Sequence, residues 1–309
     1  MEQTLKIKEL SVLWKADKQQ YVKQSTLSAY TLILENHILP TFGDKCQLVE
    51  SEIQDFALSK LHGGLSSKTV KDILIVLNMI QKYGVKKGCF PYSEWNVKYP
   101  PEDYGHELET LSVAHHRHLM HYVHDNFNFR NLGIYICLST GMRIGEVCGL
   151  KWGDFHLETE TIKVQRTVER VYIVTEGQRR TEVVIGTPKT MNSVREIPIG
   201  KELMKLVRPL KKLANDDFFV LTNESKPSEP RTYRNYFKRL LQELGIPDLK
   251  FHGLRHSFAT RCIESQCDYK TVSAILGHAS ISTTLNLYVH PSIEQKKKCI
   301  NKVMKSLDG

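Results

Sequence analysis

The chain has 309 residues, of which 41% are hydrophobic and 25% are charged, and its mean hydropathy is -0.33. These values are ordinary for a globular protein and exclude a disordered chain. No apolar run approaches the ~20 residues that a membrane-spanning helix needs, and the first residues lack the apolar segment of a signal peptide. We therefore expect a cytoplasmic protein with no membrane partner.

The charge balance favours a polyanionic partner. The 43 basic side chains exceed the 34 acidic ones, which gives a net charge of +9 and points to nucleic acid. Residues 1–106 hold 13 lysines, 12 acidic residues and no arginine. Since the planar fork of arginine matches phosphate oxygens, we expect phosphate chemistry after residue 106. Charge alone leaves open a surface that merely keeps the protein soluble.

The N-terminal residues show the spacing of helices. Apolar residues recur at helical intervals near residues 7–21, 53–61 and 70–80, and Ser25-Thr26-Leu27 begins a further helix that we expect to end before Pro40. These patterns predict a helical domain over residues 1–98. The polar, proline-bearing residues 99–109 read as a linker, and residues 110–309 as a second domain.

The second domain is predicted to be mixed. Residues 161–199 alternate in a pattern rich in Val, Ile and Thr, which predicts a small antiparallel sheet of about three strands. Helical patterns return at residues 231–244, 254–264, 269–276 and 282–289. The fold class expected is therefore mainly α with a small antiparallel β-sheet (α+β). Five histidines between residues 115 and 124 drift round a helix without completing a metal site, so we expect a solvated face and no bound metal.

Three segments carry residues suited to phosphate chemistry. In Ser139-Thr140-Gly141-Met142-Arg143-Ile144-Gly145-Glu146, a glycine ends one helix and Arg143 begins the next, where backbone amides already favour an anion. Glu146 lies three residues on and is placed to orient Arg143. A surface ion pair is the alternative for this segment.

The other two segments lie near the C-terminus. His252-Gly253-Leu254-Arg255 places an imidazole and a guanidinium three residues apart, on one side of a helix, and His256 is expected to point elsewhere. In Leu276-Gly277-His278, a histidine follows the glycine that ends a helix, and Tyr288 falls inside the next helix. Taken alone, such a tyrosine is typical of a core residue.

Six residues of this chain resemble, in type and order, the active-site set of the tyrosine recombinases, the phage-type integrases. They are Arg143, Lys189 in a hairpin turn, His252, Arg255, His278 and Tyr288. The resemblance covers residues 110–295 and, more loosely, Ser25 to Gly43, which look like the family's helical core-binding domain. The longer sheet around Glu176 to Arg180 looks like the integrases of conjugative and other integrative elements. No arm-binding domain precedes the helical region, so we expect a member that works without arm sites.

The resemblance implies a site-specific recombinase that integrates or excises a mobile element. Tyr288 would attack a DNA phosphate and form a 3'-phosphotyrosyl link, with His252 as base and Lys189 as acid. Arg143, Arg255 and His278 would hold the phosphate. Because the link conserves the bond energy, no cofactor is expected. Residues expected to contact DNA are Lys68, Lys71 and Arg195.

The resemblance also implies partners. Double-stranded DNA is the substrate, and we expect a homotetramer joined by the apolar stripe of the C-terminal tail, formed by Ile293, Ile300, Val303, Met304 and Leu307. A directionality factor or a host DNA-bending protein is a further candidate partner, and the bacterial nucleoid is the expected place of action. Two alternatives stay open: a type IB topoisomerase-like enzyme, and a catalytically idle DNA-binding accessory protein.

Overall fold

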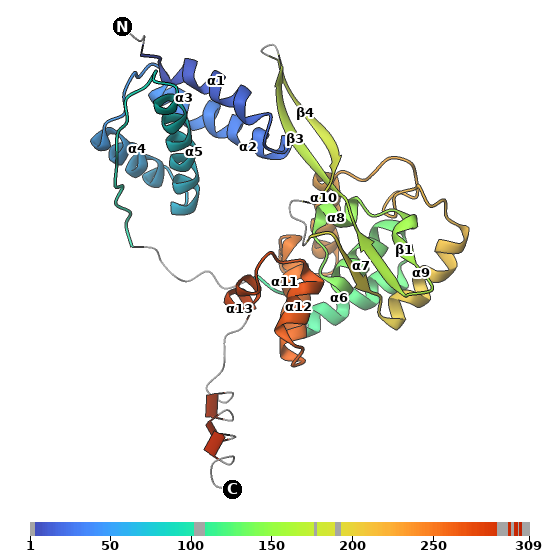
Figure 1. Cartoon of the computed structure of the whole chain (residues 1–309). Helices are drawn as coiled ribbons and strands as arrows, with labels where there is room; N and C mark the ends of the chain where they lie inside the picture. Colours follow the sequence, from blue (N-terminus) through green and yellow to red (C-terminus); the bar gives the residue numbers. More distant parts are fainter. Residues whose placement is uncertain are drawn as a thin grey trace. The chain divides into compact units, whose positions relative to one another are not determined.

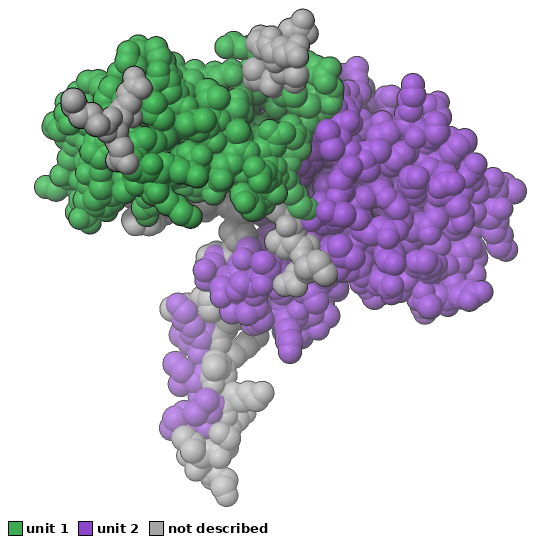
Figure 2. All heavy atoms as spheres, turned by 45° about the horizontal axis from the view of Figure 1, so that its top comes forward, with its two compact units in different colours: residues 1–106, 170–182 green, residues 107–169, 183–309 purple. Residues whose placement is uncertain are grey.

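The computed structural model describes residues 4–101, 109–175, 178–188, 193–288, 296–297, 300–301 and 303–304. They pack as two compact units, which Figure 2 distinguishes by colour. Unit 1 contains residues 1–106 together with 170–182, and unit 2 contains residues 107–169 and 183–309. The linker expected at 99–109 stays a prediction, because residues 102–108 lie outside the described residues.

Unit 1 is built from helices that surround one apolar core (Figure 1). The stripes of the sequence become their buried faces, and Trp14 and Ile73 are among the side chains that are almost fully buried. Ser66 caps the longest helix by accepting a hydrogen bond from the amide of Thr69. The helices are α1 (Ile7–Lys18), α2 (Gln24–Ile33), α3 (Leu39–Phe42), α4 (Glu50–His62) and α5 (Ser67–Lys86), with a π-helix, η1, over Leu34–Ile38.

We expected the helix that starts near Ser25 to end before Pro40. In the structure the helical chain instead continues through Pro40 to Phe42. The π-helix Leu34–Ile38 lies directly before Pro40, and it widens the hydrogen-bond ladder where proline offers no N–H. The wide π-helical turn thus accommodates the missing N–H of Pro40 without ending the helical chain, and the Phe42 side chain is buried in the core.

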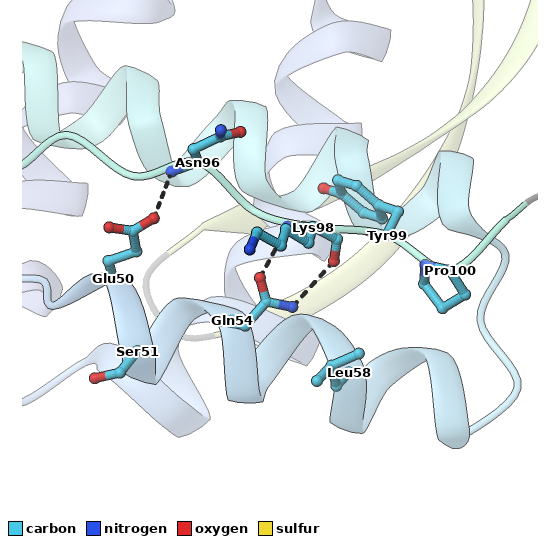
Figure 3. A pocket seen from close by; sticks show the side chains of 8 residues that line it. All are labelled: Glu50, Ser51, Gln54, Leu58, Asn96, Lys98, Tyr99 and Pro100. Atoms are coloured by element: carbon cyan, nitrogen blue, oxygen red, sulfur yellow. Dashed lines mark hydrogen bonds between the residues drawn. The ribbon is translucent and has the colours of Figure 1, made fainter.

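An extended segment, residues 91–101, lies along α4 (Figure 3). Gln54 pairs with the backbone of Lys98 twice, since its Oε1 accepts from the Lys98 amide at 2.8 Å and its Nε2 donates to the Lys98 carbonyl at 3.0 Å. Glu50 accepts from the amide of Asn96 at 3.0 Å. Polar side chains of α4 thereby satisfy a segment that has no strand partner, and Tyr99 packs against the core of unit 1.

Unit 1 also includes a piece of chain from much later in the sequence. Residues 170–182 belong to β3 (Thr167–Thr175) and β4 (Gln178–Gly186), a two-stranded sheet. The amide of Tyr172 donates to Ser28 Oγ at 2.7 Å, and its hydroxyl donates to Glu35 Oε2 at 3.0 Å. Arg179 pairs with the same Glu35 carboxylate at 3.4 Å. This strand pair therefore completes unit 1.

Unit 2 surrounds a larger core in which Trp152 and Leu254 have no exposed surface. A three-stranded antiparallel sheet has the order β1-β2-β5, with Ile162 opposite both Phe155 and Ile197. The elements are α6 (Val113–Asp125), α7 (Phe129–Thr140), α8 (Ile144–Cys148), the 3₁₀-helix η2 (Trp152–Asp154), β1 (Phe155–His156), β2 (Thr161–Val164), β5 (Arg195–Pro198), α9 (Lys201–Leu213), α10 (Pro230–Glu243), α11 (His252–Glu264), α12 (Tyr269–Leu276) and α13 (Ile281–Tyr288).

The predicted fold class, mainly α with a small antiparallel sheet, is confirmed (Figure 1). The alternating residues 161–199 form parts of two sheets rather than one, because β3 and β4 pair with each other while β2 pairs with β1 and β5. Helix α9 is an element that the sequence analysis did not predict. None of the described helices is long and apolar enough to cross a membrane.

Candidate active site

Two glycine-ended helices place the predicted residues of unit 2. Gly141 ends α7 at φ 66° and Gly277 ends α12 at φ 65°, the left-handed cap that glycine favours. A Cβ at Gly141 would lie 2.6 Å from Phe258 Cδ1, so the position is also sterically reserved for glycine. His278 follows its cap directly and Arg143 follows the other after one residue, so both lie close to the helix ends.

Glu146 organises the start of α8. Its side chain is 3% exposed, and it accepts hydrogen bonds at 2.9 Å from both the backbone amide and the guanidinium of Arg143. Burial by itself would raise the pKa of Glu146. The hydrogen bonds and charge of Arg195, with the charge of Arg143, outweigh burial and hold this pKa below its usual value. Glu146 is thus an ionised carboxylate that is hydrogen-bonded to Arg143.

Arg195 is the second partner of Glu146. Its two terminal nitrogens donate to the carboxylate at 3.1 and 3.0 Å, and its Nε donates to the carbonyl of Ile275 at 2.5 Å. The side chain is only 7% exposed. The guanidinium of Arg195 is therefore largely committed to the Glu146 carboxylate and the Ile275 carbonyl. Contact of this residue with DNA stays a prediction.

Arg255 is held by the ends of two helices. Its guanidinium donates to the carbonyl of Gly141 at 2.9 Å and to that of Leu276 at 2.8 Å. Arg143 donates to the carbonyls of Leu276 and Gly277 at 3.4 and 3.3 Å. The last carbonyls of a helix lack partners and carry the negative end of its dipole, so the ends of α7 and α12 stabilise guanidinium groups here.

The resulting cluster has an excess of positive charge. Arg143, Arg195 and Arg255 face one carboxylate, that of Glu146. Burial, followed by the charge of Arg143, lowers the pKa of Arg255 to about 9, which leaves it protonated at neutral pH. Arg255 is 1% exposed, whereas 36% of the Arg143 side chain is open to solvent. The cluster therefore favours an anion that reaches it from the side of Arg143.

Two histidines beside this cluster stay neutral. His278 Nδ1 lies 2.8 Å from Thr284 Oγ1, and burial followed by the charges of Arg255 and Arg143 lowers its pKa to about 4. The pKa of His252, also about 4, is lowered first by desolvation and then by His256 and the arginines. Neutral imidazoles offer both a donor and an acceptor nitrogen.

Tyr288 lies beside His278 and His256 and is 8% exposed. Its ring is nearly parallel to that of His278, with an interplanar angle of 8° and centroids 6.5 Å apart. Its hydroxyl oxygen is 2.7 Å from His256 Nδ1. Burial raises the pKa of Tyr288, while the charges of Arg255 and Arg143 oppose that rise. The side chain thus combines a packed ring with a hydroxyl that points at a polar partner.

His256 is the site residue that sequence reasoning missed. The expectation that it points elsewhere is wrong, because its Nδ1 contacts the Tyr288 hydroxyl. The available signal was its spacing, since His252 and His256 are four residues apart and so share one face of α11. Their rings meet edge to face, with centroids 4.6 Å apart.

Other predicted residues are not placed in this cluster. Lys189 lies outside the described residues. Lys68 is exposed in the first turn of α5, and Lys71 Nζ lies 4.9 Å from the centre of the Tyr99 ring, both in unit 1. Their contact with DNA stays a prediction. Among the described residues, no three His, Cys, Asp or Glu side chains are grouped as metal ligands.

Comparison with known proteins identifies the family. The profile of the phage integrase family matches residues 109–295, and that of the phage integrase N-terminal SAM-like domain matches residues 6–57. The chain is 28% identical over 304 residues to a XerC-like tyrosine recombinase of Caldanaerobacter subterraneus, covering 90% of this chain and 77% of that protein. It is 25% identical over 296 residues to the ICEBs1 integrase of Bacillus subtilis, covering 88% of this chain and 75% of that protein.

Solved structures share the fold. The Tn1549 transposon integrase in complex with transposon right end DNA has a TM-score of 0.78 at 21% identity, covering 97% of this chain and all of that one. Lambda integrase bound to DNA has a TM-score of 0.63 at 17% identity, covering 90% of this chain and 94% of that one. With one family profile spanning most of unit 2 and a second in unit 1, the chain belongs to the phage integrase family and is a tyrosine site-specific recombinase that breaks and rejoins DNA strands.

Proposed function

We propose that Tyr288 is the nucleophile of this recombinase and that Arg143 and Arg255 bind the scissile phosphate. The observation that carries the proposal is the arrangement of one buried tyrosine hydroxyl beside an arginine cluster with excess positive charge. Attack by the Tyr288 oxygen on phosphorus would form a 3'-phosphotyrosyl link and release a 5'-hydroxyl. The link conserves the energy of the phosphodiester, so rejoining draws on no ATP.

The other residues take the roles that the chemistry requires. A phosphodiester is anionic and its leaving alkoxide is strongly basic, so the site must supply positive charge and a proton donor. Arg143 and Arg255 stabilise charge on the non-bridging oxygens, with His278 donating a further hydrogen bond. The family resemblance assigns the role of general base to His252 and that of general acid to Lys189. Glu146 and Arg195 support this set by fixing Arg143 and the end of α12.

We further propose that the DNA substrate is a mobile element. Two similar proteins, ICEBs1 integrase and Tn1549 transposon integrase, carry the names of such elements. The recombinase would work as a homotetramer on double-stranded DNA in the bacterial nucleoid, aided by a directionality factor or a host DNA-bending protein. In the described part of the tail, Ile300, Val303 and Met304 are 62%, 51% and 51% exposed, which supports docking of this stripe on a second protomer. Ile293 and Leu307 lie outside the described residues.

The nucleophile is tested by trapping protein covalently linked to DNA. Nicked duplexes from the ends of the element are incubated with wild-type protein, with Tyr288→Phe and with Tyr269→Phe, which alters an exposed tyrosine of unit 2. We expect an adduct with the wild type and Tyr269→Phe, a free 5'-hydroxyl on the released strand, and no adduct with Tyr288→Phe.

Three outcomes separate the alternatives. If all three proteins bind the DNA and none forms an adduct, the catalytic assignment fails and the idle accessory protein is favoured. An adduct with Tyr288→Phe would move the nucleophile to another residue. Relaxation of supercoiled DNA by a monomer, without strand exchange, would favour the topoisomerase-like alternative, whereas a DNA-dependent tetramer supports recombination.

A further inference from the structure

The hydroxyl of Tyr288 is contacted by an imidazole that the family resemblance does not assign. His256 Nδ1 is 2.7 Å from this hydroxyl, the length of a strong hydrogen bond. The ring centroids of the two residues are 5.6 Å apart. Because His256 projects from α11 and Tyr288 from α13, the contact joins two separate helices. The contact places a titratable nitrogen within hydrogen-bond distance of the oxygen that would attack phosphorus.

The direction of this hydrogen bond follows from the chemistry of the two groups. A phenol is a good donor, and a neutral imidazole has one acceptor nitrogen. Burial followed by the charge of Arg255 lowers the pKa of His256, while Glu109 opposes this shift, so the imidazole is neutral at pH 7. The Tyr288 hydroxyl therefore donates to Nδ1, and the lone pairs of its oxygen remain directed away from the proton acceptor.

We propose that His256 is a catalytic residue, the group that accepts the phenolic proton of Tyr288 when this tyrosine attacks the DNA phosphate. The inference rests on the proposed role of Tyr288. In the cleavage step the Tyr288 O–H proton passes to His256 Nδ1, the bond from the tyrosine oxygen to phosphorus forms, and the bond from phosphorus to the 5'-oxygen breaks. The leaving oxygen takes a proton from Lys189. Rejoining reverses each transfer, so atoms and charge balance.

His252 then takes a different part from the one that the resemblance assigns. It packs edge to face on His256, and its side chain keeps contact with solvent. In this arrangement His252 would donate a hydrogen bond to a phosphate oxygen, while His256 accepts the proton of the nucleophile. The charged and titratable groups around His256 are Tyr288 from α13, His252 and Arg255 from α11, and Glu109 from the segment before α6.

The test is the pH dependence of single-turnover cleavage by the full chain. The substrate carries sulfur in place of the bridging 5'-oxygen, so the leaving group needs no acid and Lys189 does not limit the rate. With the wild type we expect a plateau near neutral pH and a fall on acidification, as His256 gains a proton. His256→Asn keeps a polar atom near the position of Nδ1 but cannot accept a proton.

We expect His256→Asn to cleave about 100-fold more slowly at pH 7. Its rate should rise tenfold per pH unit towards alkaline pH, because hydroxide must then form the phenolate. His118→Asn, which alters an exposed histidine of α6, is the matched control and should keep the wild-type profile. His256→Ala, assayed with and without free imidazole, gives a second test if the asparagine variant folds poorly.

The outcomes distinguish the inference from the function on which it rests. If His256→Asn retains the wild-type plateau and acid limb, or loses rate equally at every pH, His256 is not the proton acceptor although Tyr288 remains the nucleophile. Failure of imidazole to restore His256→Ala, in a protein that still binds DNA, overturns the inference as well. If the wild type itself forms no adduct, the proposed function has failed first.

Discussion

Replacing Arg195 by methionine should destabilise unit 2 strongly. The change removes two hydrogen bonds to the Glu146 carboxylate, at 3.1 and 3.0 Å, and one to the Ile275 carbonyl. Methionine has similar bulk, so little cavity remains. The carboxylate is 3% exposed and keeps a salt bridge to Arg143 alone among its two described ion-pair partners. Breaking a buried ion pair from one side costs about 3–5 kcal/mol, and we expect an effect of that size.

A double variant separates the buried charge from the lost packing. Glu146→Gln combined with Arg195→Met removes the carboxylate that Arg195 neutralises. We expect the double variant to be more stable than the sum of the single changes predicts, by about 1–3 kcal/mol. The sign of this coupling energy is the essential point, because the changes in unfolding free energy would simply add if the two side chains only filled space.

The pH dependence provides a second check on the same pair. In the folded chain the pKa of Glu146 is lowered, so its stabilising contribution is present above the usual glutamate pKa of about 4.3 and disappears as pH falls through the folded value. Arg195→Met removes a main cause of the lowered pKa. The difference in unfolding free energy between wild type and variant should therefore narrow as the solution is acidified below that pKa.

The assay is urea unfolding followed by tryptophan fluorescence. Trp152 is fully buried in unit 2, whereas Trp14 and Trp95 belong to unit 1. A background with Trp14→Phe and Trp95→Phe therefore reports on unit 2 alone. A change of less than about 0.5 kcal/mol for Arg195→Met, the range of ordinary surface substitutions, would refute the reasoning.

Three further predictions use the same site. Gly141→Ala should lower the free energy of unfolding, measured in urea, by about 1–3 kcal/mol, because its Cβ would lie 2.6 Å from Phe258 and the backbone is at φ 66°. The control Gly186→Ala, whose Cβ would meet no atom within 4 Å, should change the unfolding free energy little. Arg143→Ala should lower the rate of adduct formation more than Arg143→Lys; equal losses would contradict a bidentate phosphate contact. The pKa of His278 is lowered to about 4, so unfolding free energy should fall as pH drops from about 6.5 towards 4, and His278→Asn should flatten this slope in the same urea assay.

Local relations in the site could be predicted from the sequence, because they depend on helical spacing. Glu146 lies three residues from Arg143 on one short helix, and the predicted contact is present. The pairing of Glu146 with Arg195 spans 49 residues and depends on how β5 packs beside α8, so spacing could not reveal it. His256 was within reach of the same helical argument as Arg255, and only its contact with α13 required tertiary structure.

The fold shows the same division. The apolar stripes of α1, α4 and α5 predicted helices because burial on one face imposes the helical period. The passage of the chain through Pro40 was not predicted, since a proline usually ends a helix and the π-helix before it has no simple sequence signal. Alternation predicted strands in residues 161–199 but not which strands pair, because pairing is set by distant partners.

The membership of residues 170–182 in unit 1 has a consequence for synthesis of the chain. When the first hundred residues have left the ribosome, Ser28 and Glu35 still lack the partners that Tyr172 and Arg179 provide. Unit 1 therefore reaches its final set of contacts only after residue 182 has emerged. The last contacts close a loop of more than a hundred residues, from Tyr172 to Ser28 and Glu35, and such late closure is slow compared with local helix formation.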